Sequence, residues 1–138
     1  MKEEFNPESL KSLVADFKDF PQAGVVFRDI SPVLANPAAF TAAAQAMALN
    51  FQESSITKVA GIEARGFLFA PAVASILGVG FSPIRKAGKL PGDTMAESYG
   101  LEYGRDTLEI QANAITTEDR VLLADDVLAT GGTLAAAA

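Results

Sequence analysis

The stretch Val121–Thr133, VLLADDVLATGGT, decides the fold that we expect for this chain. Its apolar start is typical of a buried strand, and Gly131 or Gly132 opens a helix. Between them stand two adjacent aspartates, Asp125 and Asp126, and a loop of small residues. A strand that passes through a short loop into a helix is the repeating unit of α/β proteins, so we expect that fold class.

Outward from this stretch, the apolar pattern predicts that strands alternate with helices. The expected strands are Gly24–Ile30, Lys58–Ile62, Val79–Ile84, Thr107–Ala112 and Val121–Ala124. The expected helices are Glu8–Phe20, which Pro21 ends, Pro37–Phe51, which Asn36 caps, and Gly66–Leu77, which Gly78 ends. Arg85–Arg105 is rich in glycine and charge, which predicts a long loop or hairpin. Such an order implies a parallel sheet with helices on its faces, and ligands bind beyond the carboxyl ends of its strands.

The composition limits the chemistry that this chain can perform. A length of 138 residues fits one domain with a buried core. The sequence has no cysteine and no histidine, which excludes disulfides, thiolate chemistry and the usual zinc ligands. A metal would therefore have to be a hard, oxygen-bound ion such as magnesium. The net charge of −6 argues against nucleic-acid binding, which needs a basic surface.

The distribution of charge also bears on location. The first ten residues carry charges where a signal peptide has its apolar core. The two uncharged runs, 30–52 and 66–84, are divided by prolines and by polar residues or glycines, unlike a membrane span. We therefore expect a cytoplasmic protein without a membrane partner.

Two loops after the expected strands carry charged side chains. Glu63 and Arg65 follow the strand Lys58–Ile62, where the alternative is an ordinary turn with a surface ion pair. Further on, the loop IRKAGKLPGDT groups Arg85 with Lys86 and Lys89 around two glycines, in a chain that is acidic as a whole. Concentrated positive charge of this kind suits an oligophosphate, although a solvated basic loop is the alternative.

The third loop is the opening stretch. Two adjacent carboxylates repel each other, so burying Asp125 beside Asp126 requires a cation or hydroxyl donors, such as a ribose diol or its magnesium ion. The residues from Ala129 to Thr133 present backbone N–H groups and a helix start, which hold a phosphate monoester. The alternative is a capped helix with exposed acids. Together, the three loops suit a ribose that carries phosphate at one end and pyrophosphate at the other.

Five stretches of the chain resemble the type I phosphoribosyltransferases. LLADDVLATGGT matches the phosphoribosyl-pyrophosphate signature of that family. The stretches FPQAGVVFRDISPVL, AGIEARGFLFAPAVA, IRKAGKLPG and YGLEYGRDTLEI are similar to the members that act on adenine. The resemblance implies an α/β fold whose parallel central sheet is flanked by helices, with an N-terminal hood and a flap hairpin. It places residues 1–138 in a single domain, with the hood at 1–35 and the core at 36–138, including a flap at about 92–112.

The resemblance also implies an activity. Members of the family that act on adenine convert it, with phosphoribosyl pyrophosphate and Mg²⁺, to AMP and pyrophosphate in purine salvage, and they are generally homodimers. Asp125 and Asp126 are then the ligands of the ribose hydroxyls and the candidate contacts of the metal. The 5-phosphate lies in the loop formed by Ala129, Thr130, Gly131, Gly132 and Thr133. The pyrophosphate group is bound by Glu63, Ala64, Arg65, Lys86 and Lys89, with the Glu63–Ala64 peptide bond often cis in this family.

The same resemblance assigns the base and the chemistry. Adenine is contacted by Val26, Phe27 and Arg28, with Phe27 stacked on the ring. Glu102 is the candidate acid or base near adenine N7 or N9 and is classed as catalytic together with Arg65. Tyr103 is the flap residue that closes over phosphoribosyl pyrophosphate. Without histidine, a carboxylate is the best remaining proton carrier.

Three alternatives stay open at this point. The chain could be a non-catalytic sensor of phosphoribosyl pyrophosphate, an inactive truncated fragment, or a phosphoribosyltransferase for guanine, hypoxanthine or a pyrimidine. Family members usually continue through the rest of the last helix and further strands. The resemblance therefore implies that this chain is truncated in its last helix, lacks the C-terminal strands and exposes apolar surface.

Overall fold

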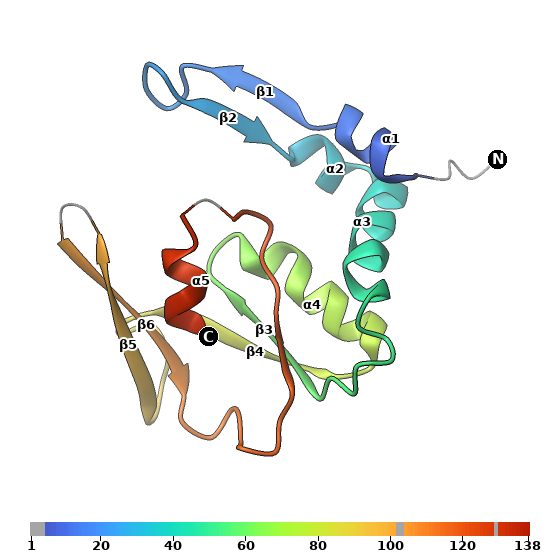
Figure 1. Ribbon diagram of the computed structural model, residues 1–138. Coiled ribbons are helices and arrows are strands. Elements are labelled where there is room, and N and C mark those ends of the chain that lie inside the picture. The colour runs from blue at the N-terminus through green and yellow to red at the C-terminus, as the bar shows by residue number, and fades with distance from the viewer. Residues whose placement is uncertain (1–4, 102–103, 129) are drawn as a thin grey trace. The chain divides into compact units, whose positions relative to one another are not determined.

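The computed structural model describes residues 5–101, 104–128 and 130–138 (Figure 1). The chain divides into two compact units, Met1–Leu49 and Asn50–Ala138. The first unit contains the segment 1–35, which we expect to form the hood, and extends to Leu49. Within the described ranges, every helix is too short or too polar to cross a membrane.

The described part of the first unit, residues 5–49, contains three helices and one hairpin. Their bounds are α1 Pro7–Ser12, β1 Ala15–Lys18, β2 Val26–Asp29, α2 Ser31–Ala35 and α3 Pro37–Leu49. β1 pairs with β2 in antiparallel fashion, so that Phe17 lies opposite Phe27. Asn36 caps α3 as predicted, because its Oδ1 accepts the N–H groups of Ala38 and Ala39 at 3.0 and 3.1 Å.

One prediction for the first unit is wrong. The helix expected over Glu8–Phe20 ends at Ser12, because the following residues gain backbone hydrogen bonds by pairing with β2. The helical spacing of its apolar residues is therefore overridden, and Phe17 remains half exposed on the hairpin. After β2, the Ser31-Pro32 pair begins α2, a helix that the sequence pattern did not predict, and a proline is tolerated in its first turn.

The second unit is built on a five-stranded sheet in the order β5-β6-β4-β3-β7. The strands are β3 Lys58–Ile62, β4 Gly80–Lys86, β5 Thr94–Leu101, β6 Gly104–Gln111 and β7 Val121–Leu123. β3 runs parallel to both β4 and β7, which confirms the parallel centre of the sheet. The hairpin β5–β6 adds to β4 in antiparallel fashion, within the segment expected as the flap.

Helices cover both faces of this sheet. On one face, α4 Gly66–Leu77 packs so closely that a Cβ atom at Gly61 would lie 2.7 Å from the Cβ of Ala70. On the other face, a buried core of Ala60, Ile62, Ile84 and Leu108 receives apolar residues of α5 Gly132–Ala137. Neighbouring residues of a strand point to opposite faces, which is why Gly61 and Ala60 meet different helices. Gly78 ends α4 in the left-handed conformation, as predicted.

Candidate active site

A cavity of about 380 Å³ lies at the carboxyl ends of β3 and β7. Because these strands are parallel neighbours, the loops that follow them meet at the same edge of the sheet. The cavity is lined by Ile62, Glu63, Ala64, Arg65, Gly66, Asp125, Asp126, Val127, Leu128, Thr130, Gly131, Thr133 and Leu134. Its volume is within the range of small-molecule sites. The structure therefore brings together the loop after β3 and the loop after β7, as the parallel order of the strands predicts.

Arg65 and Asp126 join these two loops through an ion pair. The Nε and Nη2 atoms of Arg65 lie 2.6 and 2.5 Å from Oδ2 of Asp126. The other carboxylate oxygen of Asp126, Oδ1, is buried and has no hydrogen-bond partner among the described residues. The carboxylate is only 4% exposed, whereas the Arg65 side chain is 40% exposed. The site therefore contains one buried acceptor that a hydroxyl donor or a cation can satisfy.

Asp125 lies beside Asp126, whose carboxylate raises the pKa of Asp125. The Asp126 backbone N–H donates to Oδ1 of Asp125 at 2.8 Å. Burial raises the pKa of Asp125, and the neighbouring Asp126 carboxylate raises it further, against the lowering effects of this N–H and of Arg65. The predicted repulsion between the two carboxylates is thus present in the folded chain.

The loop after the aspartates turns into α5 at Gly131. Gly131 has φ +83°, a left-handed conformation that favours glycine, and it caps the helix that begins at Gly132. The Gly132 N–H faces the Thr130 hydroxyl at 3.4 Å. Thr130, Gly131 and Thr133 line the cavity. Ala129, which was predicted in the same loop, lies outside the described residues.

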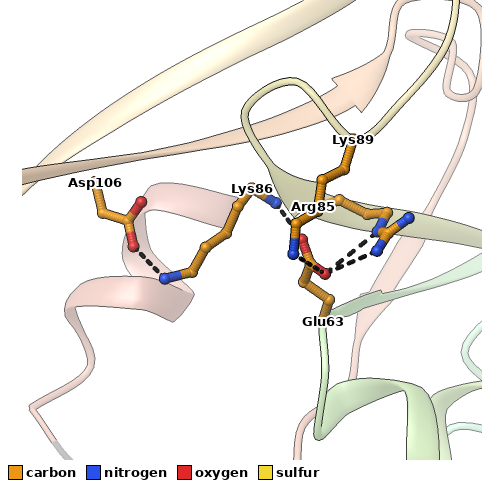
Figure 2. A network of polar contacts seen from close by, with 5 residues as sticks. All are labelled: Glu63, Arg85, Lys86, Lys89 and Asp106. Atoms are coloured by element: carbon orange, nitrogen blue, oxygen red, sulfur yellow. Dashed lines mark hydrogen bonds and ion pairs between the residues drawn. The ribbon is translucent and has the colours of Figure 1, made fainter.

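Glu63 contacts basic residues at the end of β4 and in the loop that follows it (Figure 2). Its Oε2 lies 3.0 Å from Nη2 of Arg85 and 3.0 Å from Nζ of Lys89, and its Oε1 accepts the Lys86 backbone N–H at 2.6 Å. Partial burial tends to raise the pKa of Glu63, but the Lys86 N–H and the two cations lower it to about 2. The peptide bond from Glu63 to Ala64 is cis, as the resemblance implies.

The Lys86 side chain points away from Glu63, toward the hairpin β5–β6 (Figure 2). Its Nζ atom lies 2.6 Å from Oδ2 of Asp106, which also accepts the Tyr99 hydroxyl at 3.2 Å. Asp106 raises the pKa of Lys86, and Lys86 in turn lowers the pKa of Asp106. The roles of Arg85 and Asp106 in this network were missed in the sequence, because a partner twenty or more positions away leaves no local signal.

The remaining predicted residues lie elsewhere. Val26, Phe27 and Arg28 belong to β2 of the first unit, whereas the cavity is formed by residues of the second. There, Phe27 packs edge to face on Phe20 with ring centroids 5.2 Å apart. Glu102 and Tyr103 lie outside the described residues. The sequence reasoning also missed Val127 and Leu128, two largely exposed apolar residues at the cavity, whose signal was their place directly after the acid pair.

Known proteins resemble this chain in both sequence and fold. A family model described as a phosphoribosyl transferase domain matches residues 29–138. An adenine phosphoribosyltransferase of Yersinia pseudotuberculosis is 52% identical over 127 residues, which cover 92% of this chain and 68% of that relative. The adenine phosphoribosyltransferase of Saccharomyces cerevisiae, solved in complex with adenine and an imino-altritol bisphosphate, matches with a TM-score of 0.90 and 44% identity, over 94% of this chain and 76% of that chain. The same enzyme from Thermoanaerobacter pseudethanolicus matches with a TM-score of 0.89 and 45% identity, over the same shares.

Proposed function

Because this chain belongs to the adenine phosphoribosyltransferases, a family of transferases, we propose that it moves the phosphoribosyl group of phosphoribosyl pyrophosphate onto adenine. The products are AMP and pyrophosphate, and the reaction belongs to purine salvage. The observation that carries the proposal is the cavity that Asp125 and Asp126 line together with Arg65 and the glycine turn before α5. Within it, Oδ1 of Asp126 has no hydrogen-bond partner among the described residues. A sugar diol, a phosphate and a pyrophosphate find complementary groups there.

The ribose and its 5-phosphate occupy the loop after β7 in this proposal. Asp125 and Asp126 accept hydrogen bonds from the 2- and 3-hydroxyls, which supplies the donors that the buried oxygen of Asp126 needs. The 5-phosphate accepts backbone N–H groups of the turn and of the first turn of α5. The residues of this phosphate site are Ala129, Thr130, Gly131, Gly132 and Thr133.

The pyrophosphate group occupies the loop after β3. Arg65, Lys86 and Lys89 supply positive charge, and the backbone of Glu63 and Ala64 shapes the turn. Displacement at the anomeric carbon passes through an oxocarbenium-like state, so charge that develops on the leaving pyrophosphate must be stabilised. Arg65 has a partly exposed guanidinium that can turn from Asp126 to that group. This is why we class it as a catalytic residue.

Magnesium fits the oxygen donors of this site. Mg²⁺ is usually bound by one or two carboxylates together with substrate phosphates, and Asp126 has a buried oxygen without a hydrogen-bond partner among the described residues. Asp125 and Asp126 would hold the ion together with the substrate. When bound, it would neutralise negative charge on the pyrophosphate group.

The base and the proton transfer complete the proposal. Val26, Phe27 and Arg28 contact adenine, with Phe27 against the ring. Glu102 holds or moves the proton at N7 or N9, and Tyr103 closes over the substrate to exclude water. The homodimer that the resemblance implies and the cytoplasmic location that the distribution of charge predicts stay predictions.

The direct test incubates this chain with phosphoribosyl pyrophosphate, Mg²⁺ and one nucleobase at a time, with detection of nucleotide and pyrophosphate. AMP formed from adenine alone supports the proposal. Nucleotide formed from guanine, hypoxanthine or a pyrimidine instead contradicts the base assignment. Binding of phosphoribosyl pyrophosphate without turnover contradicts the catalytic role and points to a sensor or to an inactive fragment.

Two variants test the assigned roles. Asp126→Ala should weaken phosphoribosyl-pyrophosphate binding by about 10- to 100-fold, since charge-assisted hydrogen bonds are lost. Glu102→Ala should mainly lower kcat. An unchanged rate for Glu102→Ala means that its proposed role is wrong.

A further inference from the structure

Glu63 lines the cavity, and its carboxylate contacts Arg85 at the end of β4 and Lys89 in the loop between β4 and β5 (Figure 2). We propose that Glu63 is a positioning residue, whose carboxylate holds Arg85 and Lys89 together as a preassembled receptor for the pyrophosphate group. Glu63 does not bind pyrophosphate through its side chain, and it acts only through these two cations. The inference rests on the proposed function and names the residues that organise one end of that site.

Burial decides which member of the network faces a ligand. The Glu63 side chain is only 8% exposed, whereas Arg85 is 35% and Lys89 is 49% exposed. Both cations approach the same oxygen, Oε2, at 3.0 Å. The carboxylate therefore lies beneath two cations that keep part of their surface open to an incoming anion.

Electrostatics explains why these cations need a carboxylate. A guanidinium and an ammonium within hydrogen-bond distance of one oxygen lie close enough to repel each other. Lys89 also stands on a turn between Gly88 and Gly92, both of which have positive φ, so the chain there is not stiffened by side-chain sterics. Without Glu63, repulsion and loop entropy would separate the two charges.

The charge of Glu63 also excludes direct contact with the substrate. Its pKa of about 2 keeps the carboxylate ionised at neutral pH. An ionised carboxylate repels pyrophosphate, so any favourable effect on that ligand must pass through the cations it holds. The backbone N–H of Lys86, which donates to Oε1, adds a third anchor and ties the end of β4 to the same group.

The competing explanation is that Glu63 only neutralises excess positive charge. The two explanations predict opposite signs. If Glu63 merely cancels charge, Glu63→Gln makes the site more positive and binds pyrophosphate more tightly, above all at low salt. If Glu63 positions the cations, the same variant binds pyrophosphate more weakly, because glutamine accepts the contacts without attracting the cations.

The experiment measures binding of inorganic pyrophosphate by calorimetry, together with KM and kcat for both substrates. For Glu63→Ala we expect the pyrophosphate Kd and the KM for phosphoribosyl pyrophosphate to rise about 10-fold, with Glu63→Gln between that and the native chain. The KM for adenine should change by less than about 2-fold, and Glu63→Asp, which keeps the charge, should recover most of the loss.

Asp119→Asn is the matched control. Asp119 is also a largely buried carboxylate with a lowered pKa, but it lies before β7, near the amino ends of β3 and β7. There it accepts hydrogen bonds from the Thr57 hydroxyl and the Thr116 backbone N–H. This variant should lower the thermal midpoint as Glu63→Gln does while leaving pyrophosphate binding unchanged. If Glu63→Gln and Asp119→Asn both lose pyrophosphate binding in proportion to their loss of stability, the role of Glu63 is purely structural.

The outcomes separate this inference from the proposed function. Suppose that the native chain makes AMP and that Glu63→Gln and Glu63→Ala bind pyrophosphate as tightly as the native chain or more tightly. This result overturns the inference and leaves the proposed function intact. Suppose instead that the native chain makes no AMP but binds pyrophosphate, and that Glu63→Ala loses this binding. This result overturns the proposed function and supports the inference. A native chain that does not bind pyrophosphate overturns the inference.

Discussion

At the scale of single residues, Asp125 shows that the site is built at a cost in stability. Burial and the adjacent Asp126 raise its pKa, which means that the folded state disfavours the charged form. A neutral side chain of similar shape would avoid this repulsion and part of the desolvation cost. Such a conflict is typical of functional sites, where binding chemistry overrides local stability.

Replacing Asp125 with asparagine should therefore stabilise the fold. Asparagine keeps an oxygen that can accept the Asp126 N–H but removes the repulsion. We expect the free energy of unfolding at pH 7 to rise by about 0.5–2 kcal/mol, while binding of phosphoribosyl pyrophosphate weakens. Urea titration at several pH values measures the effect.

The pH dependence of this gain has a definite sign. The destabilisation by Asp125 is absent below its ordinary pKa of 3.8, where the group is protonated in both states, and it develops as the pH rises through the raised folded value. The advantage of the asparagine variant should consequently vanish at low pH. A variant that is less stable than the native chain at pH 7 contradicts the argument.

At the scale of elements, the packing of α4 on β3 sets the position of the loop that carries Glu63 and Arg65. A Cβ atom at Gly61 would lie 2.7 Å from Cβ of Ala70 and 2.9 Å from the carbonyl oxygen of Gly66. The second of these atoms belongs to the backbone and cannot rotate away. The helix therefore approaches the strand as closely as only glycine permits.

Gly61→Ala should separate α4 from β3 and destabilise the chain by about 1–3 kcal/mol, as overpacked core variants do. Gly80→Ala is the control, because Gly80 lies on the neighbouring strand β4 and its Cβ would meet no atom within 4 Å. We expect that control to change stability by less than about 1 kcal/mol. Equal effects of the two variants in urea titration would show that the contact with α4 does not matter.

The hairpin β5–β6 binds Lys86, which we propose as a contact of pyrophosphate, through Asp106. The ion pair with Asp106 is partly exposed, so its loss in Asp106→Asn should change stability little. The freed ammonium should strengthen pyrophosphate binding by about 2- to 5-fold at low salt. Calorimetry with inorganic pyrophosphate measures this change.

Glu97→Gln provides the comparison for that result, since it removes the same charge from an exposed position of the same hairpin. It should leave pyrophosphate binding close to that of the native chain. If both variants strengthen binding equally, the effect comes from net charge and not from the contact between Lys86 and Asp106.

At the scale of the whole molecule, acid should weaken the fold mainly through carboxylates that are paired or hydrogen-bonded in the folded chain. The pKa of Glu63 is about 2 in the folded chain against an ordinary value of 4.5, so the unfolded chain takes up this proton first as the pH falls. The contribution of Glu63 is complete above about pH 4.5 and is lost as the pH falls to about 2. Asp106 and Asp119, whose pKa values are also lowered, act in the same direction.

Glu63→Gln should make stability less dependent on pH across that window. The native chain and the variant are compared by urea unfolding from pH 6 to pH 2, where the variant should show the shallower slope. Parallel curves for the two proteins would mean that Glu63 has the same pKa in the folded and unfolded chains.

Much of the fold could be read from local patterns. The bounds of β3 and α4 agree with the prediction, because a short apolar run and a left-handed glycine are signals within a few residues of the element. The helix predicted over Glu8–Phe20 was wrong because β1 forms through pairing with a strand about ten positions away. Local spacing cannot report a partner that the chain reaches only after a turn.

The candidate site divides in the same way. The sequence by itself determined its chemical groups, the acid pair, the glycine turn and the basic loop, and the parallel strand order implied that the loops after β3 and β7 would meet. Only the tertiary structure decided which charge meets which: Arg65 binds Asp126, Glu63 gathers Arg85 and Lys89, and Lys86 turns to Asp106. The reason is physical, since residue types are local properties, whereas ion pairs between distant segments depend on distances that exist only once the sheet has formed.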